Sequence, residues 1–169
     1  MKQRGLKRIF LVCTIIWMAV IFSYSNKNDT ASEKDSYAVG IKVGKVLVKD
    51  FEKQTEKEQL NYAKRIDFPV RKCAHATEYA ILCLLVFGAL GGGRNLQHRL
   101  MVSWCISVLY AVTDEIHQYF VPGRACRFLD VCIDGSGALV MVCLLLLYTL
   151  LRQRCSRGKI RRDAGTKQL

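Results

Sequence analysis

Long apolar runs separated by shorter polar segments dominate the chain. Pro122-Gly123 ends one of these runs, and the glycines at positions 91 to 93 end another, because glycine and proline interrupt helices. The second, third and fourth of these runs are each close to the ~20 residues that a helix needs to cross about 30 Å of hydrocarbon. The pattern predicts an all-α membrane protein with four transmembrane helices, over about residues 8–24, 69–91, 100–120 and 129–151.

The first apolar run, IFLVCTIIWMAVIF, follows a basic start and precedes SYS. This order also fits a secretory signal that is cleaved after a small residue. Trp17 and Tyr24 favour a retained helix, because aromatic side chains anchor spans at the membrane interface. The later spans are predicted in either case.

Residues 24–68 form a polar segment with nearly balanced charges. Ser32 followed by Asp35 fits a helix cap, and apolar side chains recur on one face of the helix that would follow. We therefore expect an amphipathic extracytoplasmic helix near residues 32–53. Such a helix could cover the protein surface or lie in the plane of the membrane.

Charge bears on the orientation and on the class of partner. The chain has 26 Lys and Arg residues against 14 Asp and Glu residues, a formal net charge of +12. The basic residues of MKQRGLKR and of the tail, residues 152–169, lie close to span ends, and the positive-inside rule weights such charges. We therefore expect both termini in the cytoplasm and a single membrane domain over residues 1–169. No basic patch interleaved with aromatic residues indicates a nucleic-acid partner.

The eight cysteines indicate neither a disulfide framework nor a zinc site. The chain has no C-x-x-C pair, and several cysteines lie inside apolar runs, where a free thiol behaves as a small hydrophobic group. The sequence identifies no cofactor.

Ionisable residues interrupt the later spans at one end of the expected bundle. Arg71, His75, Glu78 and Tyr79 share one face of the second span, since residues three and four apart are neighbours on a helix. The third span carries Asp114, Glu115 and Gln118 near its end, and the fourth carries Asp130 and Asp134 near its start. Up-and-down connections bring these three stripes to the same extracytoplasmic side.

Convergence matters because an isolated charge in the membrane is expensive, about 2.5–3.5 kcal/mol at mid-span on insertion scales. Facing one another, the acids can pair with the bases of the second span and of the loop at Arg124. The sequence thus predicts a shared polar pocket. Its candidate ligand-binding residues are Arg71, Lys72, His75, Glu78, Tyr79, Asp114, Glu115, Gln118, Arg124, Asp130 and Asp134.

Simpler roles are open for some of these residues. Lys72 could extend to the membrane interface, Asp130 could cap the fourth helix, and Tyr79 could only pack. Glu78 is harder to explain, because it lies about ten residues, or 14 Å, into its span. A carboxylate at that depth needs a partner or a water-filled cavity.

Two segments resemble the VanZ-like family of bacterial multi-pass membrane proteins, over about residues 8–151. In RKCAHATEYAIL the resemblance rests on Arg71, Lys72, His75, Glu78 and Tyr79. In DEIHQYFVPGRACRFLDVCIDGSGA it rests on Asp114, Glu115, Gln118, Phe120, Pro122, Gly123, Arg124, Asp130 and Gly137. The family usually has asparagine where this chain has Asp134. It is named for a member linked to resistance against teicoplanin-type antibiotics, so the resemblance implies a place in the bacterial cell envelope and no particular reaction.

Three functions remain open. An outward polar pocket could bind an envelope lipid headgroup, a wall precursor or an amphiphilic glycopeptide antibiotic, since Arg71 and Arg124 can grip phosphate or carboxylate. A metal-assisted enzyme acting on lipid-linked phosphate could use the same acids as oxygen ligands, although no H-E-x-x-H spacing appears. The cluster could instead hold the helices in register, leaving function to a protein partner. Such contacts contribute only about 0.6 kcal/mol each in one measured bundle, so we favour a binding pocket over structure or catalysis.

Overall fold

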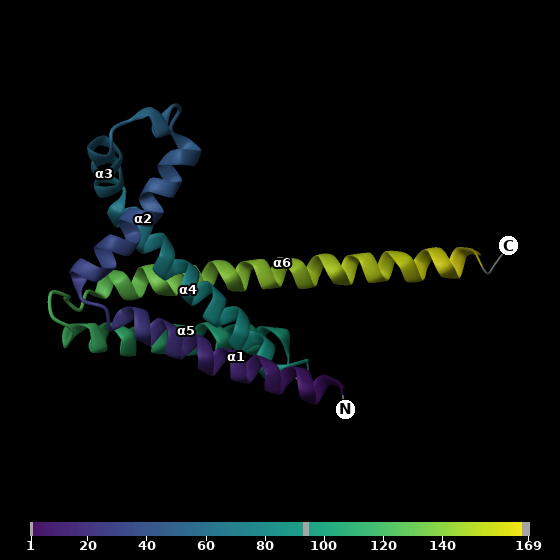
Figure 1. Cartoon of the computed structure of the whole chain (residues 1–169). Helices are drawn as coiled ribbons and strands as arrows, with labels where there is room; N and C mark the ends of the chain where they lie inside the picture. Colours follow the sequence, from purple (N-terminus) through teal and green to yellow (C-terminus); the bar gives the residue numbers. More distant parts are fainter. Residues whose placement is uncertain (1, 93–94, 167–169) are drawn as a thin grey trace.

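The computed structural model describes residues 2–92 and 95–166, with side chains over 4–92 and 95–156. The described residues form helices and contain no strand (Figure 1). In chain order these are α1 (Lys2–Ser25), α2 (Asp29–Leu47), the short 3₁₀ helix η1 (Phe51–Lys53), α3 (Glu56–Arg65), α4 (Asp67–Leu90), α5 (Leu96–Tyr119) and α6 (Phe128–Thr166). The expectation of an all-helical chain is therefore confirmed.

Three of the described helices are long and apolar enough to cross a membrane. They cover Arg4–Ser25, Asp67–Leu90 and Phe128–Ser156. These match the predicted spans 8–24, 69–91 and 129–151. Helix α5 coincides with the third predicted span, 100–120, and is 24 residues long, but it is not among these three helices.

Helix α4 lies at the centre of the bundle, against α1, α5 and α6. The core around it contains Ile21, Tyr79, Leu82, Val86 and Ala111. Two side-chain hydrogen bonds join α1 to its neighbours. The Trp17 indole N–H donates to the Glu78 carbonyl at 2.9 Å, and the Tyr110 hydroxyl donates to the Met18 carbonyl at 2.7 Å. Both acceptors are helix carbonyls, which can accept a second hydrogen bond while they keep the one within the helix. The two bonds therefore fix the position of α1 against α4 and α5 without disrupting any helix.

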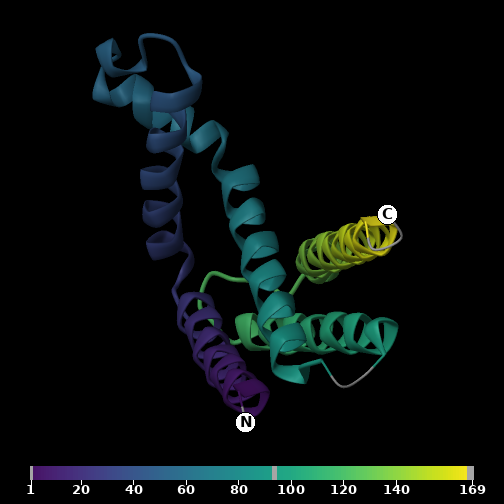
Figure 2. The ribbon, with the colours of Figure 1, turned by 90° about the vertical axis from the view of Figure 1, so that its right-hand side faces the viewer.

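The segment between α1 and α4 forms an arm that stands out crosswise to α6 (Figures 1 and 2). The helix expected near 32–53 begins earlier, at Asp29, because the Asn28 side chain caps it by accepting from the Ala31 N–H. It ends at Leu47, and Asp50 takes a left-handed conformation with φ 58°. A helix is therefore present near the expected position, but it covers Asp29–Leu47 and not residues 32–53.

The buried face of α2 is also not the apolar one that we expected. It consists of the small residues Ser36, Gly40 and Gly44. A β-carbon at Gly44 would lie 2.4 Å from the Phe51 ring, and one at Gly40 would lie 3.1 Å from Ala63. Helix α2 therefore packs closely on η1 and α3 through a stripe without bulky side chains, while Val46 and Leu47 remain exposed.

Helix α6 continues past the predicted span 129–151 as one helix to Thr166 (Figure 1). The predicted basic tail, residues 152–169, is thus largely helical, and its last three residues lie outside the described part of the chain. All eight cysteines are free in the structure.

Candidate functional site

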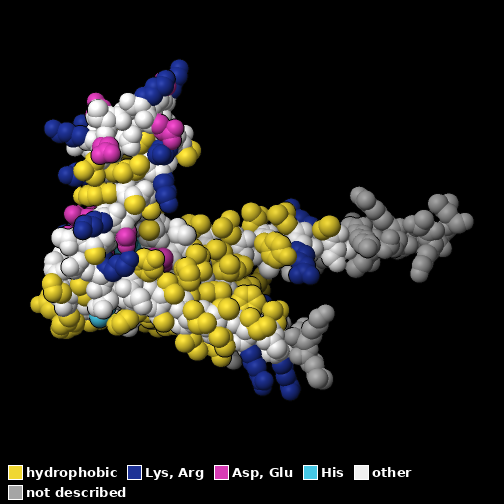
Figure 3. Space-filling view, viewed as in Figure 1, with side chains coloured by type: hydrophobic (Ala, Val, Ile, Leu, Met, Phe, Trp, Pro, Cys, Tyr) yellow, Lys and Arg dark blue, Asp and Glu magenta, His cyan; other side chains and the backbone are white. Residues whose placement is uncertain are grey.

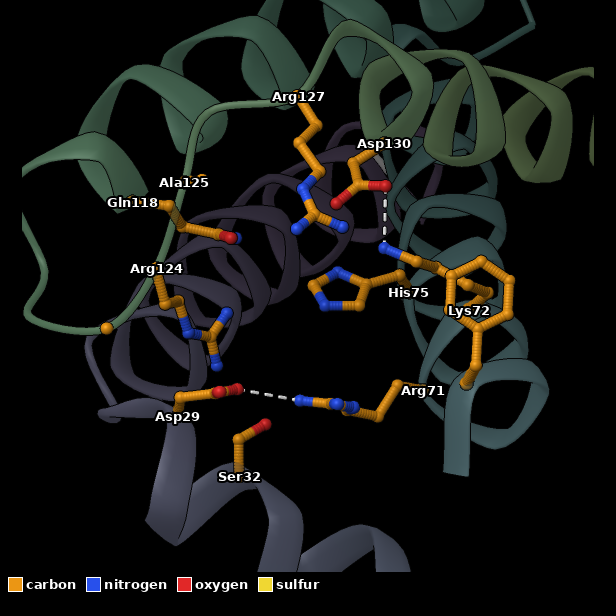
Figure 4. Close-up of a pocket in the computed structure, with 12 residues that line it drawn as sticks. Asp29, Ser32, Arg71, Lys72, His75, Gln118, Arg124, Ala125, Arg127 and Asp130 are labelled. Carbon is orange, nitrogen blue, oxygen red and sulfur yellow. Dashed lines mark hydrogen bonds and ion pairs between the residues drawn. The ribbon is translucent and has the colours of Figure 1, made fainter. Parts of the chain in front are cut away.

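A cavity of about 170 Å³ opens at the end of the bundle where α1 ends and α4 and α6 begin (Figure 4). Helices α2, α4 and the α5–α6 connection all contribute to its wall. The lining residues are Asp29, Ser32, Phe68, Arg71, Lys72, His75, Gln118, Gly123, Arg124, Ala125, Arg127 and Asp130. Side chains predicted from three separate spans therefore meet at one place.

Arg71 joins the arm to the bundle. One guanidinium nitrogen lies 2.9 Å from Asp29 on α2, and the other lies 2.6 Å from Asp67, one turn earlier on α4. The Ser36 hydroxyl donates to the second oxygen of Asp67, which is buried. The fork of Arg71 is thus held open between two carboxylates, and it faces the cavity with its direction fixed.

Lys72 and Asp130 form an ion pair between α4 and α6. The ammonium nitrogen lies 2.6 Å from Oδ1, and both side chains are less than one-fifth exposed. Lys72 therefore does not simply extend to the interface. Asp130 also lies in the first turn of α6, where a carboxylate suits the positive end of the helix dipole, so the capping role that we considered for it is compatible with the pair.

Arg124 and Arg127 come from the loop that joins α5 to α6. Neither side chain forms an ion pair with a carboxylate of the described residues, and the buried Nε of Arg124 has no hydrogen-bond partner among them. Burial lowers the pKa of the Arg124 guanidinium, while Asp114 acts in the opposite direction. A guanidinium nevertheless stays charged at neutral pH. Among the described residues, these two positive charges have no carboxylate partner in an ion pair. The guanidinium of Arg124 faces the same space as that of Arg71 (Figure 4).

A group of acids lies deeper in the bundle than the four bases that line the cavity, Arg71, Lys72, Arg124 and Arg127. His75 stands between the two, with Nδ1 3.9 Å from both Glu78 and Asp134. Asp134 is only 1% exposed, and no donor of the described residues bonds either of its oxygens. Asp114 is also buried and accepts from the Gln118 side chain at 3.0 Å. Glu78, whose depth in the span led us to expect a partner or a water-filled cavity, thus lies beside His75.

The predicted residues differ in what surrounds them. Glu115 accepts from the Arg127 backbone N–H at 2.9 Å, so it holds the α5–α6 loop. Tyr79 is buried in the core, with its ring 6.3 Å from that of Tyr110. Neither of these two residues lines the cavity. Within the described residues, no three His, Cys, Asp or Glu side chains are grouped so as to hold a metal ion.

Two polar residues that line the cavity, Asp29 and Ser32, escaped the sequence analysis, as did Asp67, which lies outside the lining but bonds Arg71. Asp67 had a signal, because a carboxylate four residues before Arg71 faces it on a helix. Asp29 and Ser32 had none, since only the path of the arm brings α2 beside α4. Their contribution is to fix Arg71 and to narrow the cavity on the arm side.

One of the comparisons with known proteins identifies a family. No curated protein and no solved structure matches the chain. The model of the VanZ/LLP1 family matches residues 10–152, a range that includes α4, α5, parts of α1 and α6, and every residue that lines the cavity. The chain therefore belongs to the VanZ/LLP1 family.

Proposed function

We propose that this protein is a four-span component of the bacterial cell envelope that binds an anionic amphiphile in the cavity described above. In this proposal α5 is the third span, both termini are cytoplasmic, and the cavity opens on the extracytoplasmic side. The ligand is an envelope lipid headgroup, a wall precursor or an amphiphilic glycopeptide antibiotic, and binding the last of these would contribute to glycopeptide resistance.

The excess of positive charge in the cavity supports this proposal. Its lining contains Arg71, Lys72, Arg124 and Arg127 but only two acids, Asp29 and Asp130. Arg71 and Lys72 already form ion pairs with carboxylates, whereas Arg124 and Arg127 form none within the described residues. Guanidinium groups match phosphate and carboxylate through paired N–H donors. An anion between Arg124 and Arg71 could accept a hydrogen bond from the Arg124 Nε, which is buried and has no partner among the described residues.

The surroundings of the cavity favour an amphiphile over a free ion. Phe68 lines it and is 57% exposed, and Phe128 and Leu129 at the start of α6 are also largely exposed. Apolar side chains of this kind would face acyl chains if α4 and α6 cross the bilayer. A ligand could then place its charged group in the cavity and keep its apolar part in lipid.

Native mass spectrometry of the purified protein tests the proposal. Phosphatidic acid, phosphatidylcholine and teicoplanin are the probes, offered separately at equal concentration. We expect wild-type protein to retain phosphatidic acid or teicoplanin, and Arg124→Gln to lose at least tenfold in affinity, because a charge-assisted hydrogen bond contributes about 1.5–3 kcal/mol. Arg65→Gln removes an exposed arginine of the arm and serves as the matched control.

Unchanged binding in Arg124→Gln would remove the cavity as the binding site. If wild-type protein retains neither phosphatidic acid nor teicoplanin, the polar cluster is left with a structural role in holding the helices together. Teicoplanin susceptibility of cells that express each variant separates the resistance role from binding itself.

A second candidate is acid–base catalysis on a lipid-linked phosphate. The observation that favours it is the position of His75 between the bases that line the cavity and the acids Glu78 and Asp134. Its Nδ1 lies 3.9 Å from a carboxylate oxygen of each. Release of phosphate from phosphatidic acid by wild-type protein, lost in His75→Asn with binding retained, would support it. Binding without turnover at every pH would leave only the first proposal.

A further inference from the structure

A second cavity, of about 350 Å³, lies at the opposite end of the bundle, where α1 begins and α4 ends. Its volume falls in the range of about 300–1,000 Å³ that is typical of sites for small molecules. All four bundle helices contribute to it. The lining residues are Leu6, Lys7, Phe10, Leu84, Phe87, Gly88, Gly91, Gly92, Arg99 and Leu145.

Glycines on the last turn of α4 let α1 approach that helix closely here. A β-carbon at Gly88 would lie 2.3 Å from the Phe10 ring. At Gly91 it would lie 1.7 Å from Lys7 Cε, and the positive φ of 64° favours glycine at this helix end. The Lys7 side chain therefore lies against the backbone of Gly91, and Lys7 is one of two basic residues that line the cavity.

Arg99 supplies the second charge. It donates to the Phe87 carbonyl at 3.0 Å, and its guanidinium stacks 3.8 Å from the centre of the Phe87 ring. Its buried Nε has no hydrogen-bond partner among the described residues. Among the described residues, the lining contains the bases Lys7 and Arg99 and no acid. The cavity thus has two basic side chains beside apolar walls, and one of them, Arg99, is held in place by its contacts with Phe87 on α4.

We propose that this second cavity binds one anionic phospholipid. The phosphate would sit between Lys7 and Arg99, and part of one acyl chain would lie along Phe10, Leu84 and Leu145. Charge complementarity supports this occupant, because a neutral lipid would leave both bases uncompensated, whereas basic pockets between spans suit anionic headgroups. Basic side chains also gather near the start of α1 in Figure 3. Assignment to the cytoplasmic leaflet rests on the orientation proposed above, but the binding itself does not.

Lipid competition on the full chain tests this inference. The protein is purified in neutral detergent and offered phosphatidylglycerol and phosphatidylcholine with identical chains. We expect wild-type protein to retain phosphatidylglycerol about tenfold better, and the double variant Lys7→Gln/Arg99→Gln to lose that preference. Arg8→Gln is the matched control, because it removes a neighbouring base that does not line the cavity. Leu145→Trp fills the apolar part and is expected to weaken retention of both lipids.

Equal retention of the two lipids by wild-type protein would overturn the inference without any variant, so a double variant that fails to fold does not leave it untested. An unchanged preference in a folded double variant, or unchanged retention in Leu145→Trp, would do the same. Arg124→Gln separates the two sites. If it abolishes the phosphatidylglycerol preference, the lipid belongs to the first cavity and this inference fails, whereas loss of phosphatidic acid binding alone leaves it intact.

Discussion

Gly137 on α6 lies against the backbone of Ala76 on α4, so closely that a β-carbon added at Gly137 would fall 2.0 Å from the Ala76 carbonyl oxygen. Only glycine allows this contact. One turn before Gly137, Asp134 lies beside His75, and one further turn places Asp130 beside Lys72. The contact therefore sets the register in which the acids of α6 face the bases of α4.

Gly137→Ala is expected to destabilise the protein by about 1–3 kcal/mol, the usual cost of overpacking. The two helices must separate to admit the methyl group, so the Lys72–Asp130 pair should also lengthen. Thermal unfolding in detergent measures the change. Gly135→Ala is the matched control, since its β-carbon would meet only Val108, at 3.4 Å. Equal melting temperatures for both variants would show that α4 and α6 do not rely on this contact.

Arg71→Ala is expected to release the arm. The side chain bonds both Asp29 and Asp67, and it is only 30% exposed, so both carboxylates lose a charged partner together. Amide hydrogen exchange over residues 29–47 should accelerate about tenfold, which corresponds to ~1.4 kcal/mol. Lys27→Gln removes a more exposed ion pair to Asp35 and should change little. Equal exchange in the two variants would mean that the arm is held by packing alone.

Asp130→Asn is expected to strengthen binding of phosphatidic acid. The substitution frees Lys72 from its carboxylate partner and makes the cavity more positive. One charge removed near the ligand is worth ~1 kcal/mol, so affinity should rise about fivefold in low salt and by less as salt screens the cavity. Asp35→Asn, in the exposed pair with Lys27, should leave binding unchanged. A loss of affinity in Asp130→Asn would show that Lys72 must be held by Asp130 in order to contact the ligand.

Helix α3 is expected to loosen at acidic pH. The Thr55 hydroxyl and backbone N–H both donate to the Glu58 carboxylate, at 2.8 and 2.9 Å, and these bonds lower its pKa from the ordinary 4.5. Because the folded state favours the ionised form, the stabilisation is complete above pH 4.5 and disappears as the pH falls through the lowered value. Hydrogen exchange of α3 amides should rise over this interval. Glu58→Gln should remove the step, whereas Glu56→Gln, at the first position of α3, should keep it.

Labelling of single cysteines is expected to establish the number of spans. With one cysteine kept at a time, an impermeant maleimide should reach Cys126 in the α5–α6 loop on intact cells. Cys155, and a cysteine introduced by Gly92→Cys, should react only after permeabilisation. Gly92 suits this test because a side chain there meets nothing within 4 Å. Labelling of positions 92 and 126 from the same side would remove α5 as a span and place the two cavities on one face of the membrane.

Helix positions were predictable from local properties. Apolar runs bounded by Gly91 and Pro122 located α4, α5 and the start of α6 to within a few residues, because the length of a span and its breakers are written in consecutive residues. The arm was less predictable. The sequence offered two capping residues for α2, Asn28 and Ser32, and the structure uses Asn28. The buried stripe of α2, Ser36, Gly40 and Gly44, has no apolar pattern in the sequence. These residues are buried because neighbouring parts of the arm pack against them.

The sequence alone determined that the chain is a helical membrane-type protein, and that Arg71, His75, Glu78 and the acids of α5 and α6 occupy one end of its helices. Helical periodicity and the cost of burying charge in lipid are sufficient for that much. Only the tertiary structure decided which charges pair. Arg71 turns to Asp29 and Lys72 to Asp130, while Arg124 is left without a carboxylate within the described chain. Pairing depends on distances of a few ångströms between helices, and those are set by close contacts such as that of Gly137 with Ala76, which no single segment encodes.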